Sequence, residues 1–253
     1  MPDIDLSHIS VVILAAGRGT RMKSDPDKNK VTHLLHGKPI ILHAREMLQK
    51  AGIESVIVVV GHAWESVKEV LGDTVTYAHQ NEPKGTGDAL KCALSIIPHG
   101  TTQLVSMYGD DSAFYTAELI HEIVSSHTES NAAITLLTVH KKDPFGLGRI
   151  IRNAEGEIVA IVEEKSATEA QKNITEINTG LFCFDTKFLH ETIGEISPNP
   201  ITNEYYITDL VDLAIKKGLK VNSITKNNEN VWFGINTKEQ LEEAHGVATP
   251  MDP

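Results

Sequence analysis

Two glycines and five basic side chains lie close together in a chain that is acidic as a whole. The stretch 14–30 contains Gly17, Gly19, Arg18, Arg21, Lys23, Lys28 and Lys30, whereas the 253 residues carry a formal net charge of −11. Glycine lets backbone N–H groups approach phosphate oxygens, and nearby cations offset the phosphate charge. This stretch therefore predicts a binding site for a phosphate-bearing anion.

The spacing of the glycines excludes two common phosphate loops. A dinucleotide-binding loop needs a third glycine, and Met22 stands in its place. A Walker loop needs Gly-Lys followed by Ser or Thr, and this stretch has no such sequence. A Gly-x-Gly pair alone is also typical of an ordinary surface loop. The surrounding secondary structure must therefore show whether this stretch lies where a ligand could bind.

Those elements alternate between short apolar runs and helical periodicity. Strands are expected at 10–15, 55–60, 75–79, 104–108 and 134–139, and helices at 39–50, 64–71, 85–97 and 118–126. Such alternation predicts an α/β fold with a mostly parallel sheet and helices on both faces. Ligands of such sheets bind beyond the carboxyl ends of the strands, which is where stretch 14–30 begins.

The regular alternation of strands and helices ends after Pro144. A hairpin is expected over 149–163, turning at residues 153–156, followed by helices at 206–217 and 238–244 with a strand at 221–224. We interpret this half as an antiparallel insertion within a single domain that spans residues 1–253.

The composition of the chain excludes several classes of partner and compartment. The acidic balance, with a pI near 5.5, argues against nucleic acid and anionic membranes as partners. The N-terminus lacks the charge pattern of a signal peptide, and the longest apolar runs are too short to cross a bilayer. Cys92 and Cys183 form no C-x-x-C pair and are expected to be buried thiols, and the twelve histidines form no convincing metal-ligand set. We expect a cytoplasmic protein.

The string Leu14-Ala15-Ala16-Gly17-Arg18-Gly19-Thr20-Arg21-Met22 resembles the signature of the sugar-nucleotide pyrophosphorylases. Further blocks follow in family order: Gln80 with Gly85-Thr86-Gly87, Tyr108-Gly109-Asp110, Gly148-Arg149-Ile150, Val162-Glu163, Glu176-Ile177-Asn178-Thr179-Gly180, Glu204-Tyr205-Tyr206-Ile207-Thr208-Asp209, and Gly234-Ile235-Asn236. More narrowly, the chain is similar to the uridylyltransferase half of the bifunctional bacterial enzyme that makes UDP-N-acetylglucosamine. Because the chain stops at Pro253 without hexapeptide repeats, the acetyltransferase half of that enzyme is expected to be absent.

The resemblance implies a Rossmann-like nucleotidyltransferase with a nucleotide-binding half at about 8–140 and a sugar-binding half at about 141–245. Its substrates would be UTP and N-acetylglucosamine-1-phosphate, its products UDP-N-acetylglucosamine, a cell wall precursor, and pyrophosphate, and its cofactor Mg²⁺. It would need no nucleic acid or membrane partner.

The resemblance also assigns roles to individual residues. Arg21 and Lys30 would face the triphosphate, and Asp110 and Asn236 would hold Mg²⁺. The nucleotide would contact Leu14, Ala15, Ala16, Gly17, Gly19, Gln80, Gly85, Thr86, Tyr108 and Gly109. The sugar would contact Gly148, Glu163, Asn178, Tyr206 and Thr208. The Gln80 amide offers both a donor and an acceptor, which suits the N3–H and O4 edge of uracil.

Several alternatives stay open at this point. Lys28 could take the place of Lys30, Asp111 is a rival of Asp110 for the metal, and Asp88 stands where the family commonly has histidine. N-acetylgalactosamine-1-phosphate or glucose-1-phosphate could replace the expected sugar, and the number of assembled chains is not indicated. Two other functions compete: a cytidylyltransferase of isoprenoid synthesis, and a catalytically silent sensor of sugar nucleotides.

Overall fold

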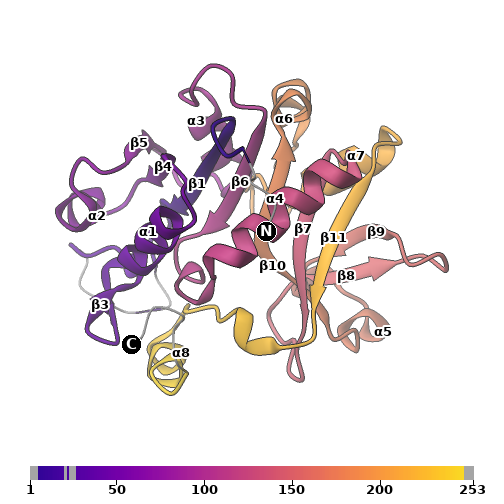
Figure 1. The fold of residues 1–253 in the computed structure, drawn as a ribbon. Coiled ribbons are helices and arrows are strands. Elements are labelled where there is room, and N and C mark those ends of the chain that lie inside the picture. The colour runs from indigo at the N-terminus through magenta and orange to yellow at the C-terminus, as the bar shows by residue number, and fades with distance from the viewer. Residues whose placement is uncertain (1–4, 20–21, 23–26, 248–253) are drawn as a thin grey trace.

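A nine-stranded sheet forms the centre of the molecule (Figure 1). The computed structural model describes residues 5–19, 22 and 27–247. Seven strands follow the order β11-β7-β10-β6-β1-β4-β5, and the β8–β9 hairpin extends from β10. The strands of this sheet are β1 (Ile9–Ala15), β4 (Ser55–Val60), β5 (Thr76–His79), β6 (Gln103–Tyr108), β7 (Ile134–His140), β8 (Arg149–Arg152), β9 (Ile158–Val162), β10 (Glu176–Asp185) and β11 (Val221–Lys226).

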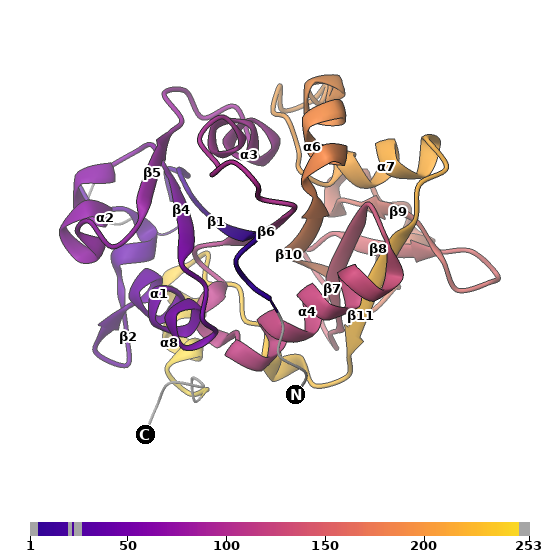
Figure 2. The same cartoon turned by 45° about the horizontal axis from the view of Figure 1, so that its top comes forward.

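The helices lie on both faces of this sheet, as expected. They are α1 (Ile40–Lys50), α2 (Trp64–Leu71), α3 (Thr86–Leu94), α4 (Ala117–Ser130), α5 (Glu169–Lys172), α6 (Thr186–Thr192), α7 (Asp209–Lys216) and α8 (Lys238–Ala244). Alternate residues of each strand point to opposite faces. Val11 and Ile13 of β1 share a core with α1, α2 and α4, whereas Val12 and Leu14 share one with α3, α6 and α7. Figure 2 shows α3, α6 and α7 above the sheet and α1 and α4 below it.

The sheet is mostly parallel, which confirms the predicted architecture. β1 runs parallel to β4 and β6, β4 to β5, and β7 to β11. β10 runs antiparallel to both of its neighbours, β6 and β7. β8 and β9 form the antiparallel hairpin expected in the second half of the chain.

The sequence patterns missed β10, although it lies in the middle of the sheet. Both faces of this strand are covered, so its residues lack the polar–apolar alternation that marks a half-exposed strand. Its register also shifts between Asn178 and Phe182, around Gly180 with a φ of +83°. An Asn-Thr-Gly sequence is more typical of a turn than of a central strand.

A third, smaller core brings the C-terminal segment back to the first half of the chain. Ile235 and Ala244 pack there with Leu35, Ile40 and Phe114. The short β2 (Leu34–Leu35) and β3 (Lys38–Pro39) form a separate two-stranded sheet beside it. This packing holds the segment before α8 close to the carboxyl ends of β1 and β6.

Most element bounds agree with the expected ones, and the differences are local. β4, α2 and α8 match exactly the residues expected, whereas α3 ends at Leu94 and α7 begins only at Asp209. Cys183 is buried as expected, but Cys92 is only half-buried. Within the described ranges, no helix is long and apolar enough to cross a membrane.

Candidate active site

The carboxyl ends of β1 and β6 meet where the predicted nucleotide-binding residues lie. Leu14 is in register with Tyr108, and the Gly109 N–H donates to the Leu14 carbonyl at 3.0 Å. A Cβ on Gly109 would lie 3.0 Å from Val31 Cγ1, so the close approach of these segments leaves little room for a side chain. Ala15 and Ala16 are buried at the same edge, followed by the exposed Gly17 and Arg18.

Lys30, Asp110 and Asn236 converge from three distant segments. The Lys30 ammonium forms an ion pair with Asp110 Oδ2 and donates to Asn236 Oδ1 at 3.4 Å. Asp110 is only 7% exposed, so solvent screens this pair weakly. Of the two candidate lysines, Lys30 therefore lies beside the expected metal ligands. Lys28 lines a separate hollow of about 620 Å³ with Asp27, His62, Glu65 and Glu69.

Asn29 holds the backbone from which Lys30 projects. Its side-chain amide donates to the carbonyls of Ala15 and His62 at 2.8 and 2.9 Å, and its Oδ1 accepts from the Val31 N–H. Asn29 is 1% exposed, so these bonds are shielded from water. Sequence reasoning missed this residue because its partners lie far along the chain. Arg21, the second expected triphosphate contact, lies outside the described residues.

The neighbouring carboxylates Asp110 and Asp111 have different surroundings. Asp111 Oδ2 accepts from the indole Nε1–H of buried Trp232 at 3.0 Å, which ties the end of β6 to the segment before α8. Burial raises the pKa of Asp111 well above its usual range, and the charge of Asp110 adds to the effect. Asp111 Oδ2 thus has a partner in Trp232, whereas its Oδ1 is buried without one among the described residues. Asp110, in contrast, faces Lys30 and Asn236.

The residues present fit a magnesium ion. Asp110 Oδ2 and Asn236 Oδ1 both accept from one ammonium group, so the two oxygens already converge on a cation. Mg²⁺ near nucleotides is usually held by one or two protein oxygens, with phosphate oxygens and water completing the set. No cluster of three or more His, Cys, Asp or Glu among the described residues could hold a metal.

Gln80 directly follows β5, and the nitrogen of its side-chain amide already has partners within the protein. It is 6% exposed, and its Nε2 donates to the Gly85 carbonyl at 3.0 Å and to Asp88 Oδ2 at 2.7 Å. The donor that we expected to meet uracil O4 is therefore already used within the protein. Gln80 also lines a cavity of about 340 Å³ with Ala16, Arg18, Gly61, Trp64 and His79.

Gly85 and Thr86 join the two halves of the molecule. Gly87 N–H donates to the Tyr205 carbonyl at 2.8 Å, and Tyr205 N–H donates to the Lys84 carbonyl at 2.8 Å. At Gly85, where φ is +99°, a Cβ would lie 2.5 Å from the Tyr205 carbonyl oxygen, so only glycine fits. The Thr86 hydroxyl accepts from the Ile207 N–H at 3.0 Å, a contact to the second half that we had not expected.

Three of the expected sugar-binding residues lie together on the hairpin and β10. Asn178 N–H donates to the Gly148 carbonyl at 2.9 Å, and a Cβ on Gly148 would lie 3.4 Å from Glu163 Oε1. Burial raises the pKa of Glu163, and the charge of Asp209 raises it further, while Arg149 opposes both. Hydrogen bonds from the hydroxyl or amide groups of a sugar would stabilise the charged form of this buried carboxylate.

The remaining expected residues lie around the same edge. A Cβ on Gly180 of β10 would overlap the ring of Tyr108, which explains the glycine beside this aromatic side chain. Thr208 is 7% exposed and directly precedes α7. The Tyr206 hydroxyl is 2.8 Å from Thr202 Oγ1, so it has a partner within its own loop.

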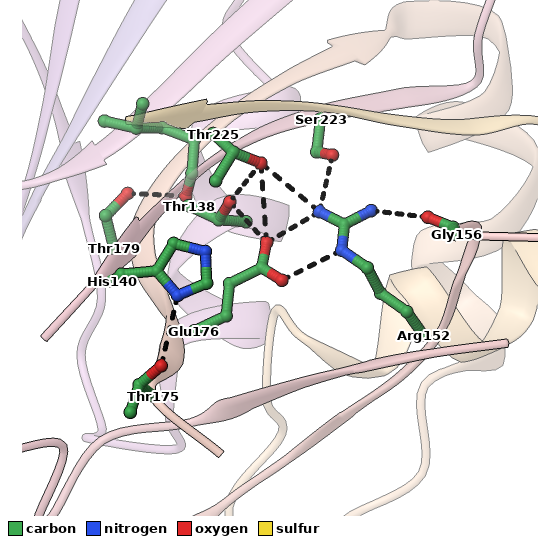
Figure 3. A network of polar contacts seen from close by, with 10 residues as sticks. Thr138, His140, Arg152, Gly156, Thr175, Glu176, Thr179, Ser223 and Thr225 are labelled. Carbon is green, nitrogen blue, oxygen red and sulfur yellow. Dashed lines mark hydrogen bonds and ion pairs between the residues drawn. The ribbon is translucent and has the colours of Figure 1, made fainter. Parts of the chain in front are cut away.

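A polar network holds the hairpin against the edge of the sheet (Figure 3). Arg152 of β8 donates to both carboxylate oxygens of Glu176 on β10, at 2.9 and 2.6 Å. The same guanidinium reaches the Gly156 carbonyl and Ser223 of β11. Burial alone would raise the pKa of Glu176, but the hydrogen bonds from Arg152 and Thr138 outweigh it and hold the pKa below its usual range. Sequence reasoning missed this network, which links the four strands β7, β8, β10 and β11.

Comparison with known proteins identifies the class. The chain belongs to the nucleotidyl transferase family, whose model matches residues 10–249. It is 39% identical to the bifunctional protein GlmU of Acetivibrio thermocellus over 236 residues, which cover 93% of this chain and 50% of that protein. It is 40% identical to GlmU of Carboxydothermus hydrogenoformans over 230 residues, which cover 91% and 50%. The chain thus spans about half the length of these curated relatives, and the predicted family is confirmed.

A solved structure shares the fold. A Bacillus anthracis protein assigned as a glucose-1-phosphate thymidylyltransferase matches with a TM-score of 0.79 at 22% identity, over 97% of each chain. At this identity the likeness concerns the fold alone. It confirms the mixed, mostly parallel α/β architecture.

Proposed function

We propose that the protein is a magnesium-dependent uridylyltransferase acting on UTP and N-acetylglucosamine-1-phosphate. A phosphate oxygen of the sugar phosphate attacks the α-phosphorus of UTP, the bond from that phosphorus to the bridging oxygen breaks, and pyrophosphate leaves with the bond electrons. The products are UDP-N-acetylglucosamine and pyrophosphate. Family membership and the similarity to GlmU support the transfer of a nucleotidyl group.

The observation that carries this proposal is the convergence of Lys30, Asp110 and Asn236 beyond the end of β1. Nucleotidyl transfer needs little covalent help from the protein. It depends on positioning the reactants and on positive charge around the crowded phosphates. The half-buried Lys30 beside two convergent oxygens would supply positive charge and fixed groups for positioning within one small region.

Each group has a role in this proposal. Lys30 and Arg21 offset the charge that develops on the α-phosphate and the leaving pyrophosphate, while backbone groups at 14–19 position the nucleotide. Asp110 and Asn236 would hold Mg²⁺, which when bound offsets phosphate charge and orients the two substrates. Glu163 and Asn178 offer an acceptor and an amide to the sugar ring and its N-acetyl group, beside the backbone of Gly148.

The direct test is pyrophosphate release by the purified protein with Mg²⁺. UTP, CTP, ATP and GTP are each combined with N-acetylglucosamine-1-phosphate, N-acetylgalactosamine-1-phosphate and glucose-1-phosphate. We expect release with UTP and N-acetylglucosamine-1-phosphate and little with the other pairs. Turnover of CTP in place of UTP, or no turnover from protein that still binds UDP-N-acetylglucosamine, would contradict the proposal.

A further inference from the structure

The side-chain amide of Gln80 can take only one of its two orientations in this protein. The groups that face one end of the amide are the Gly85 carbonyl oxygen, at 3.0 Å, and Asp88 Oδ2, at 2.7 Å. A carbonyl oxygen and an ionised carboxylate accept hydrogen bonds and cannot donate them. The end that faces them must therefore be the NH₂ group, and a flipped amide would set its oxygen against two acceptors.

This orientation leaves the oxygen of Gln80 available to a ligand. Both N–H donors of Nε2 have partners, and Oε1 has none among the described residues, yet it is not sealed from solvent. Gln80 itself is 6% exposed and lines the 340 Å³ cavity beside Ala16. A nucleobase that reaches Gln80 from this cavity meets an acceptor and no donor.

Asp88 is the side chain that holds this arrangement. It lies in the first turn of α3, where a negative charge is favourable, and it is half-buried. A hydrogen bond to a charged acceptor is stronger than one between neutral groups. Of the two hydrogen bonds that orient the amide, the one to Asp88 is therefore the stronger. Its shorter distance, 2.7 Å against 3.0 Å to the Gly85 carbonyl, agrees with this.

We propose that Asp88 is a specificity-determining positioning residue. It holds the Gln80 amide in the orientation in which Oε1 accepts a hydrogen bond from an N–H group on the pyrimidine edge. The inference rests on the proposed function for the presence of a pyrimidine at this site. Uracil carries a hydrogen on N3, which Gln80 Oε1 can accept. Cytosine presents an unprotonated N3, which would lie against the same oxygen and lose its partner. The fixed orientation of the Gln80 amide thus favours UTP over CTP.

The test compares equilibrium dissociation constants for UTP and CTP, measured by calorimetry with Mg²⁺, in the wild type and three variants. Asp88→Leu has a similar size but no acceptor, so only the Gly85 carbonyl still opposes a turned amide that donates to cytosine N3. Asp88→Asn keeps an oxygen acceptor and serves as the conservative variant. Glu118→Leu removes an exposed acid from the first turn of α4, away from Gln80, and controls for the loss of a helix-terminal charge.

We expect the preference of the wild type for UTP over CTP to fall about tenfold in Asp88→Leu, the change expected for one hydrogen bond to a charged group. It should stay within about threefold in Asp88→Asn and unchanged in Glu118→Leu. A merely structural role of Asp88 would weaken both nucleotides together and leave their ratio intact. An unchanged ratio in Asp88→Leu, or a wild type that binds CTP better, would overturn the inference.

Failure of the proposed function gives a different result. Because this test measures binding, it does not depend on turnover. Absence of pyrophosphate release together with the expected shift in the UTP:CTP ratio would contradict the uridylyltransferase and leave the role of Asp88 standing. Normal release with an unchanged ratio would contradict the role of Asp88 alone.

Discussion

Lys30 differs from Lys28 in what surrounds each ammonium group. Lys30 is half-buried and contacts Asp110 and Asn236, whereas Lys28 is exposed beside Glu65 and Glu69. A cation within a desolvated cluster interacts more strongly with bound phosphates than one in water does. The two lysines are only two residues apart, so they form a matched pair for testing the role of charge at this site.

We expect Lys30→Ala to lower kcat/KM by about 10²-fold or more, because it removes a preorganised charge from the reacting phosphates. Lys28→Ala should change it by less than about threefold, as is usual for an exposed charge. Steady-state pyrophosphate release measures both variants. If Lys28→Ala were the more damaging substitution, the cation that faces the triphosphate would have been wrongly assigned.

The β8–β9 hairpin is the element that carries Gly148 and Glu163, and its position depends on Arg152. The planar guanidinium binds the Glu176 carboxylate through two nitrogens and also reaches Gly156 in the hairpin turn. Lysine keeps the charge but cannot form this paired contact. Loosening it would therefore move the sugar-binding residues that we propose and leave the nucleotide loop in place.

For Arg152→Lys we expect the KM for the sugar phosphate to rise about tenfold while the KM for UTP stays within about twofold. Arg45→Lys on α1, where the guanidinium donates to the Thr74 carbonyl, is the matched control and should change neither value. Equal increases in both KM values would show that Arg152 supports the whole fold and has no particular link to sugar binding.

Helix α4 carries a buried histidine that makes the packing of this element sensitive to acid. His127 is 4% exposed, its Nδ1 lies 3.0 Å from Thr135 Oγ1 of β7, and burial lowers its pKa to about 4. The unfolded chain would take up this proton near pH 6.5. The stability contributed by neutral His127 is therefore fully present above pH 6.5 and is lost as the pH falls from 6.5 towards 4.

Replacing His127 by glutamine, which cannot titrate, should flatten this part of the pH profile. We expect the wild type to lose up to about 3 kcal/mol of unfolding free energy through this group between pH 7 and pH 4, and His127→Gln to lose correspondingly less. Urea unfolding at several pH values measures the difference. Parallel profiles for the two proteins would show that His127 is not buried in its neutral form.

At the scale of the whole molecule, one sheet passes through both halves, and a second connection forms where Gly85 and Gly87 meet Tyr205. This connection brings the segment beside Gln80 against the segment before α7. The carboxyl ends of β1 and β6 lie between them in the sheet order. The residues that we propose for the nucleotide and for the sugar are thus held in a fixed relation, which a transfer between two bound substrates requires.

Gly85→Ala should test this connection, because the new Cβ would meet the Tyr205 carbonyl oxygen. Gly100→Ala is the matched control, since Gly100 also has a positive φ, of +88°, but no atom within 4 Å of an added Cβ. Both variants place alanine at a positive φ, so the difference between their stabilities in thermal unfolding reports the steric clash with Tyr205 alone. We expect Gly85→Ala to be the less stable by about 1–3 kcal/mol. Equal losses would mean that the loops separate at little cost.

Much of this molecule could be predicted from local patterns. Apolar runs such as residues 55–60 predicted the parallel sheet, which the structure confirms. The glycines and cations after the first strand predict a phosphate-binding loop at the carboxyl end of that strand. β10 could not be found in this way, because a strand buried on both faces and interrupted by Gly180 lacks periodicity. The roles of Asn29, Asp88 and Trp232 depend on partners brought near by the fold, so residue type and spacing did not indicate these roles.

The transfer that we propose depends on Asp110, and not on its neighbour Asp111, acting together with Lys30 and Asn236. The most direct measurement is Mg²⁺-dependent pyrophosphate release from UTP and N-acetylglucosamine-1-phosphate by Asp110→Asn and Asp111→Asn. We predict that Asp110→Asn loses about 10²-fold or more in kcat. Asp111→Asn keeps an acceptor for Trp232 Nε1–H and should stay within about tenfold of the wild type. Full activity in Asp110→Asn, or a greater loss in Asp111→Asn, would contradict the role proposed for Asp110.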